Sequence, residues 1–203
     1  MQSLDELLEE CEVLHGHMCP GQVLGARMAL LGCSTIGISE PKGRDRKKLI
    51  VWVEIDRCMA DAVSASTGAR LGKRSLKYVD YGKVAATFLN IETNDAVRIV
   101  ALESSRLLAD RLYPEIEHKK ERQFLTYRKA SDAELFQVQR VAVAVGEHDL
   151  PGSPRSRVTC NQCGEGVNDQ REVARRNEAE RLCRYCAEGG YYTLLDLGNL
   201  DSY

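Results

Sequence analysis

Residues 49–67 read LIVWVEIDRCMADAVSAST, and this stretch is the clearest guide to the fold. Its first seven residues are apolar apart from one glutamate and rich in β-branched side chains, which is typical of a largely buried strand. The strand is expected to end at Asp56, and a short helix from Cys58 to Thr67 is expected to follow and to stop at Gly68. A buried strand that leads directly into a helix predicts a domain in which helices pack on a sheet.

Two further helices are expected before this stretch. An apolar side chain recurs every three or four positions from Leu4 to Leu14, behind the N-cap candidate Ser3. A second helix is expected to begin at Pro20, because proline is tolerated at the first position of a helix, and to end at Gly32. The helices are therefore separated only by a short histidine- and cysteine-rich segment.

The pattern after residue 68 alternates between strands and helices. Two strands over 76–81 and 83–91 are expected to form a hairpin, and a long amphipathic helix over 95–113 is expected to be capped by Asn94. A charged helical segment and a further strand are expected over 115–135 and 137–145. The sequence thus predicts an α+β core with antiparallel strands and packed helices.

A change of composition marks a second part of the chain. Proline, glycine and serine cluster between positions 151 and 154, as is typical of a linker. We therefore expect a core domain over 1–150, a linker over 151–157 and a small C-terminal module over 158–203.

The overall composition excludes several classes of protein. The 203 residues are 43% hydrophobic and 29% charged, with a net charge of −2, which indicates a globular chain. No apolar run approaches the length of about 20 residues that a membrane span needs. The slightly acidic charge also argues against nucleic-acid binding as the main function, because proteins that hold a phosphate backbone are usually basic.

The chain contains eight cysteines, and the acidic segment MQSLDELLEE at its start lacks the basic and then apolar pattern of a secretory signal. A cytoplasmic location is therefore expected, where disulfides are rare. Clustered cysteines in that compartment more often bind metal or perform thiol chemistry.

Four of the cysteines form two C-x2-C pairs, Cys160/Cys163 and Cys183/Cys186, separated by 19 residues. This spacing is typical of a structural zinc site, because each pair directs two thiolates at one ion and four thiolates close its coordination shell. The line CNQCGEGV…RLCRYC resembles treble-clef and TraR/DksA-type zinc fingers. The segment from Pro151 onward contains seven arginines and eight acidic residues, and this balance of charge favours binding to a protein over binding to nucleic acid.

A second cluster is expected in the core. His17 and Cys19 enter the second helix, and Cys58 starts another helix with Asp61 one turn later. His17, Cys19 and Cys58 make a three-ligand set for a second metal ion, and His15 is a reserve ligand. An open fourth position is typical of catalytic zinc. Cys19, Cys58 and Asp61 are accordingly the candidate catalytic residues, with Asp61 orienting water or acting as a base.

Other interpretations of these cysteines remain open. Buried, inert cysteines are common in protein cores, and the same thiolates without metal could perform thiol–disulfide chemistry. Cys11 lies on an apolar helical stripe and Cys33 follows Gly32, so both are expected to pack in the core. Lys73 and Lys83 are candidates to bind an anionic substrate, although surface lysines are more often only solvated.

The segment HGHMCPG, from His15 to Gly21, followed by Gly25, resembles the signature of the FmdE family, which is named after the E subunit of molybdenum formylmethanofuran dehydrogenase. Later motifs of that family match in order over roughly residues 10–145: Cys58-x2-Asp61-Ala62, Thr67-Gly68, Gly72-Lys73, Asp80 and Gly82-Lys83. The four-cysteine tail is an addition that some members carry. The loop at 69–76 departs from the family, since it reads ARLGKRSL where many relatives resemble TxGKGNL.

The resemblance implies an α+β core, a homodimer and a cleft that contains His17, Cys19 and Cys58. It does not define a reaction, and the chain shows no molybdopterin or iron–sulfur signature, so whether it is an enzyme stays open. We expect a metal-binding protein whose core cleft handles a small molecule or one-carbon carrier. The alternatives are an accessory subunit of an oxidoreductase complex, with the finger as the protein contact, and a nucleic-acid-binding regulator.

Overall fold

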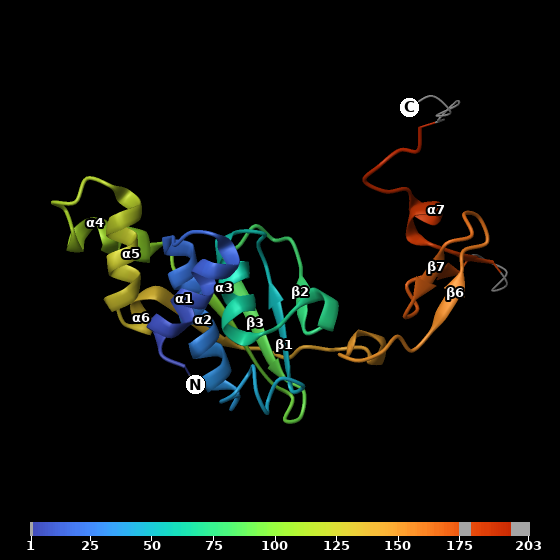
Figure 1. Cartoon of the computed structure of the whole chain (residues 1–203), viewed down its shortest axis with the longest axis horizontal. Helices are drawn as coiled ribbons and strands as arrows, with labels where there is room; N and C mark the ends of the chain where they lie inside the picture. Colours follow the sequence, from blue (N-terminus) through green and yellow to red (C-terminus); the bar gives the residue numbers. More distant parts are fainter. Residues whose placement is uncertain (1, 175–179, 196–203) are drawn as a thin grey trace. The chain divides into compact units, whose positions relative to one another are not determined.

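The structure is a computed structural model that describes residues 2–174 and 180–195 (Figure 1). Contacts within the chain divide it into two compact units, Met1–Val145 and Gly146–Tyr203, which we call the core unit and the tail unit. The proline-rich segment 151–157 lies near the start of the tail unit. None of the helices in the described ranges has the length and apolar composition that crossing a bilayer requires.

The core unit combines one mixed sheet with several helices, which confirms the predicted α+β class. The sheet has five strands in the order β2-β1-β3-β4-β5, and β2 runs parallel to β1 while the other neighbours are antiparallel. These strands are β1 (Leu49–Val53), β2 (Leu76–Tyr78), β3 (Ala85–Asn90), β4 (Asp95–Ala101) and β5 (Phe136–Arg140). The helices are α1 (Leu4–His15), α2 (Pro20–Thr35), α3 (Cys58–Thr67), α4 (Ser104–Leu112), α5 (Lys119–Lys129) and α6 (Asp132–Leu135), with a 3-10 turn, η1 (Leu71–Lys73).

Helix α2 is central to the packing of the core unit (Figure 1). It packs on β3 and β4 and also contacts α1, α3 and α5. The crossing of α2 and α3 is close because position 25 is glycine. A Cβ atom there would lie 2.5 Å from the Met59 carbonyl oxygen and 2.6 Å from the Ala62 Cβ. This close crossing brings the first residues of α2 and α3 together.

Two expectations from the sequence are wrong. The segment 95–113 forms strand β4 and then helix α4, and it is not one long helix. Asn94 has a left-handed backbone with φ 61° and lies in the turn that joins β3 to β4, so it is a hairpin-turn residue and does not cap a helix. Asparagine favours both situations, which explains the misassignment.

The expected hairpin between 76–81 and 83–91 is also absent from the described residues. Strand β2 pairs with β1 in parallel, and β3 pairs with β1 and β4. Tyr81 and Lys83 both donate a backbone hydrogen bond to the Glu54 carbonyl at the end of β1, at 3.2 and 3.1 Å. The loop after β2 is therefore tied to β1, so that β1 separates the two strands that were expected to pair.

The tail unit contains short elements only. Two antiparallel pairs form it, β6 (Arg157–Thr159) with β7 (Gly166–Asn168) and β8 (Val173–Ala174) with β9 (Arg181–Leu182). A 3-10 turn, η2 (Glu147–Asp149), precedes them and a one-turn helix, α7 (Arg184–Glu188), follows them. This arrangement is consistent with a small metal-binding module.

Candidate metal centres and the adjoining groove

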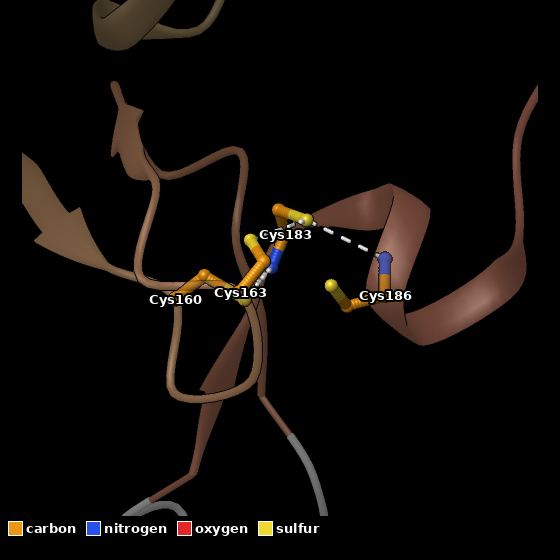
Figure 2. A group of neighbouring side chains, drawn as sticks. All are labelled: Cys160, Cys163, Cys183 and Cys186. Carbon is orange, nitrogen blue, oxygen red and sulfur yellow. Dashed lines mark hydrogen bonds between the residues drawn. The ribbon is translucent and has the colours of Figure 1, made fainter. Parts of the chain in front are cut away.

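The four tail cysteines come together from two turns (Figure 2). Cys160 follows β6 and Cys163 lies in the turn before β7, where the Gly164 amide donates to the Cys160 carbonyl at 3.0 Å. Cys183 follows β9 and caps α7, which carries Cys186. All four Sγ atoms lie within 4.8 Å of one another.

The distances between these sulfur atoms fit a shared metal ion. The Sγ atoms of Cys163 and Cys183 are 3.9 Å apart, far beyond a disulfide bond of about 2.05 Å. Sulfur atoms at the corners of a tetrahedral zinc shell lie about 3.8 Å apart, because zinc–sulfur bonds measure about 2.3 Å. The four thiols therefore form a closed shell that could hold one ion.

Backbone amides also favour thiolates here. The amides of Cys163 and Cys183 point at the Cys160 sulfur and lower the pKa of that thiol to about 6, and the Cys183 amide lies 3.2 Å from the sulfur. Burial and the neighbouring sulfurs, Cys183 first among them, raise the pKa of Cys186. Four adjacent thiols resist joint ionisation, and a cation bound between them would favour the thiolate form of all four.

A second cluster lies in the core unit, between α1 and α2. One ligand atom from each of His15, His17 and Cys19 lies within 4.8 Å of the others, and the two imidazole rings are 4.7 Å apart. Helix α1 ends at Gly16, whose φ of 88° reverses the chain. Because the chain turns at that residue, the side chains on either side of it can approach each other and Cys19, the N-cap of α2.

A carboxylate from another helix supports this cluster. The His15 Nδ1 atom donates to the Asp61 Oδ2 atom at 2.7 Å, across 46 positions of sequence. A proton on Nδ1 in this hydrogen bond leaves Nε2 free to act as a metal ligand. A carboxylate behind a histidine is the usual support of a protein metal ligand, because it orients the ring and increases its basicity. The sequence pointed to Asp61 but not to this partner.

Cys58 lies beside Cys19 but outside the group of His15, His17 and Cys19. It is the first residue of α3, and a Cβ atom added to Gly21 would lie 3.2 Å from the Cys58 Cβ and 3.8 Å from the Cys19 Sγ. Burial, followed by contact with the Cys19 thiol, raises the pKa of Cys58. Of the three ligands expected from the sequence, the structure therefore groups His17 and Cys19 with the reserve ligand His15.

A groove of about 770 Å³ runs along α3 and the ends of β1 and β2, and His15 is the member of this cluster that lines it. His15, Cys58 and Asp61 line one part of it, and Arg57 and Arg70 also face it. Neither of the lysines expected to bind an anion, Lys73 and Lys83, is among the lining residues that the structure describes. Cys11 and Cys33 are buried in the core, as expected, and burial raises the pKa of both thiols.

The core fold, its His/Cys cluster and the four-cysteine tail define an α+β protein with two candidate metal centres. The chain belongs to the FmdE family, because the model of that family, described as "FmdE, Molybdenum formylmethanofuran dehydrogenase operon", matches residues 14–142, more than half of the chain. The matched range includes the core cluster and ends before the tail cysteines.

Two known proteins are similar to this chain. A "Probable S-adenosyl-L-methionine-binding protein" of Archaeoglobus fulgidus is 35% identical over 100 residues, which are 47% of this chain and only 26% of that protein. The solved structure of an FmdE-like protein of the tungsten formylmethanofuran dehydrogenase type, from Syntrophus aciditrophicus, matches with a TM-score of 0.62 and 24% identity. That match covers 95% of this chain and 96% of the other. At this identity the second likeness shows the fold alone.

Proposed function

We propose that the protein binds a catalytic metal ion through His15, His17 and Cys19 and uses it on a small molecule held in the adjoining groove. The observation that carries this proposal is the convergence of two imidazoles and a thiol within 4.8 Å, with Asp61 hydrogen-bonded at 2.7 Å behind His15. Three protein ligands leave a fourth position for substrate or water, as in catalytic zinc sites.

The residues present suit a borderline-soft divalent cation such as zinc, because imidazole and thiolate are its preferred ligands. A zinc ion held there would supply Lewis acidity to a substrate oxygen. Asp61 would hold the His15 ring in place, and its engagement there favours a positioning role over the proton acceptor expected from the sequence. Cys58 lines the groove and is the thiol best placed to contact the substrate as a nucleophile.

For the tail unit we propose a structural zinc site formed by Cys160, Cys163, Cys183 and Cys186. A closed shell of four thiolates leaves no position for a substrate, so its role is to stabilise the tail. The strands of this unit are only two or three residues long, and the binding energy of the ion would supply much of its folding free energy.

Elemental analysis tests both sites together. Protein purified without added metal should contain two zinc equivalents per chain, and Cys160→Ser combined with Cys183→Ser should leave one. If this double variant contains no metal, the core site is wrong. If the wild type contains two equivalents but His17→Ala combined with Cys19→Ser also contains two, the assignment of the core ligands is wrong.

A second candidate function, that of an accessory subunit in an oxidoreductase complex, is favoured by an apolar surface on the tail unit. Tyr185 and Tyr192 are stacked with ring centres 4.3 Å apart, and Tyr191 packs edge-on against Tyr192 while remaining 99% exposed. Leu194 and Leu195, which follow these tyrosines in the chain, are also exposed. Exposed aromatic residues of this kind are typical of protein interfaces.

Affinity purification of the tagged chain tests this second candidate. An oxidoreductase subunit that co-purifies with the wild type and is lost with Tyr191→Ser combined with Leu194→Ser would support it. Retention of the same partners by this variant would contradict it.

We also propose that the chain is a cytoplasmic homodimer. Sedimentation equilibrium should give twice the chain mass, and a monomer would contradict that proposal.

A further inference from the structure

The groove beside the core cluster has an unusually apolar wall for an exposed surface. Three of the large hydrophobic side chains that stay exposed in the described residues border it: Leu14 (47% exposed), Leu71 (65%) and Tyr78 (43%). Val53, Ile55 and Leu76 lie deeper in the same groove. Apolar side chains gathered in one concave site favour a ligand with an apolar or aromatic body.

Arg70 places a fixed positive charge in this apolar groove. Its Nη1 atom donates to the Ser64 Oγ atom and, at 3.3 Å, to the Ala69 carbonyl. Ser64 in turn donates to the same carbonyl at 2.8 Å, so the hydroxyl that receives the guanidinium is itself held in place. The orientation of the guanidinium is therefore set before any ligand binds.

The charge of Arg70 is not neutralised by an ion pair within the part of the chain that the structure describes. Its hydrogen-bond partners are a hydroxyl and a carbonyl, and its side chain is half-buried. A guanidinium has five N–H donors, so donors remain for a ligand. A partly buried cation without a carboxylate beside it favours an anion, and a planar guanidinium suits a carboxylate or a phosphate.

The other charged groups of the groove are Arg57, Asp56 and Asp61. Asp61 is hydrogen-bonded to His15, and Asp56 and Arg57 are exposed residues that follow β1. Arg70 differs from Arg57 in being half-buried and held in place by its own hydrogen bonds. A ligand whose anionic group binds Arg70 would extend its remaining part along the groove that His15 and Cys58 also line.

We infer that this groove binds a small molecule that combines an apolar or aromatic body with one carboxylate or phosphate group, and that Arg70 anchors the anionic group. The inference rests on the proposed function, since it names the substrate class of the same site. It replaces the lysines expected from the sequence with an arginine that the fold holds in the groove.

Phenyl phosphate and benzoate are suitable probes, with benzyl alcohol as the neutral control of similar shape. Each is titrated into the full-length protein, and backbone amide signals are followed by NMR. Both anions should shift the signals of residues 57–61 and 70–72 to saturation, and benzyl alcohol should bind at least about tenfold more weakly, because a hydrogen bond to a charged group strengthens binding by that order. The stronger of the two anions identifies the anionic group that the site prefers.

Variants assign the effect to Arg70. Arg70→Gln should weaken the binding of the preferred anion about tenfold or more, whereas the exposed control Arg46→Gln, outside the groove, should stay within about twofold. Equal binding of benzyl alcohol and the anions by the wild type would overturn the inference, and this comparison does not depend on the folding of a variant. Changes confined to the amide signals of residues 29–33 and 39–43, which lie around a separate cavity of 450 Å³, would also overturn the inference.

Metal analysis of the same samples separates this inference from the proposed function. Arg70-dependent anion binding by protein that lacks a core metal ion would keep the inference and contradict the proposed function. A core metal ion without Arg70-dependent binding would keep the proposed function and contradict the inference.

Discussion

The two candidate metal centres of this chain are built in opposite ways. In the tail, four equivalent thiols from two short turns surround one point, and backbone amides donate to the sulfurs. In the core, two imidazoles and one thiol converge from a single five-residue segment, and a carboxylate from α3 supports one of them. Four sulfurs could complete a tetrahedral shell in the tail, whereas the core group offers three ligand atoms, and His15 of that group also lines the groove.

The difference shows how one chain can separate stability from reactivity. The tail unit has little apolar core, so its cluster replaces the packing that the unit lacks. The core unit is stabilised by a large buried cluster around α2 and the sheet, so a metal site there need not supply its folding free energy. The tail site should therefore control folding, and the core site should control ligand binding.

The largest effect is expected from removing the tail ligands. Cys160→Ser combined with Cys183→Ser should abolish zinc binding in the tail, where structural zinc contributes about 10 kcal/mol or more of binding free energy. NMR should show loss of dispersed signals from residues 157–188 with the core signals retained. Dispersed tail signals in this variant, or in chelator-treated wild type, would contradict a metal-dependent fold.

Loss of the core ligands should have the converse effect. His17→Ala combined with Cys19→Ser should remove one metal equivalent and any turnover, while thermal unfolding of the tail signals is unchanged. His118→Ala, at an exposed histidine far along the sequence, is the matched control and should keep both ions. Cys58→Ser should also keep both ions, and a lost equivalent would restore Cys58 to the ligand set.

The third prediction compares two glycines of the core unit, one packed closely between α2 and α3 and one in open space. Gly25→Ala should lower the free energy of unfolding of the core unit by about 1–3 kcal/mol, because the new Cβ would lie 2.5 Å from the Met59 carbonyl oxygen. Gly72→Ala has no atom within 4 Å of the new Cβ and should change stability by less than about 0.5 kcal/mol. Chemical denaturation measures both, and equal effects would contradict the close crossing of α2 and α3.

The smallest effect is expected from the carboxylate behind His15. Asp61→Asn should weaken metal binding at the core site about tenfold without changing the tail site, because the amide supports the imidazole less well. Competition with a fluorescent chelator measures this affinity. Asp56→Asn, in the same groove but without the hydrogen bond to His15, should have a smaller effect. A reversed order for these two variants would contradict the positioning role of Asp61.

The sequence predicted the tail site better than the core site for a physical reason. The spacing of Cys160, Cys163, Cys183 and Cys186 is local, and two turns suffice to bring the thiols together. In the core, the sequence indicated His17 and Cys19, but the hydrogen bond from His15 to Asp61 depends on the packing of α3 against α1. A one-dimensional pattern does not contain that contact.

The same limit applies to the fold. The sequence predicted β1 and α3, because a buried apolar run and a glycine stop are local signals. It did not predict that β1 would separate β2 from β3, because strand order depends on tertiary pairing. It assigned the strand Asp95–Ala101 to a helix, although alternation of Val97 and Ile99 on the buried face was a signal that could have corrected this. The role of Arg70 was missed because it depends on the turn that holds its side chain against Ser64.

Anomalous diffraction at the zinc edge, from crystals grown without added metal, would show directly whether the chain holds two metal ions. Two peaks per chain are expected. One lies among the four tail sulfurs, and the other lies about 2.0–2.3 Å from His15, His17 and Cys19, with its fourth position open to the groove. A single peak in the tail, or a core ion whose shell is closed by Cys58, would contradict this expectation.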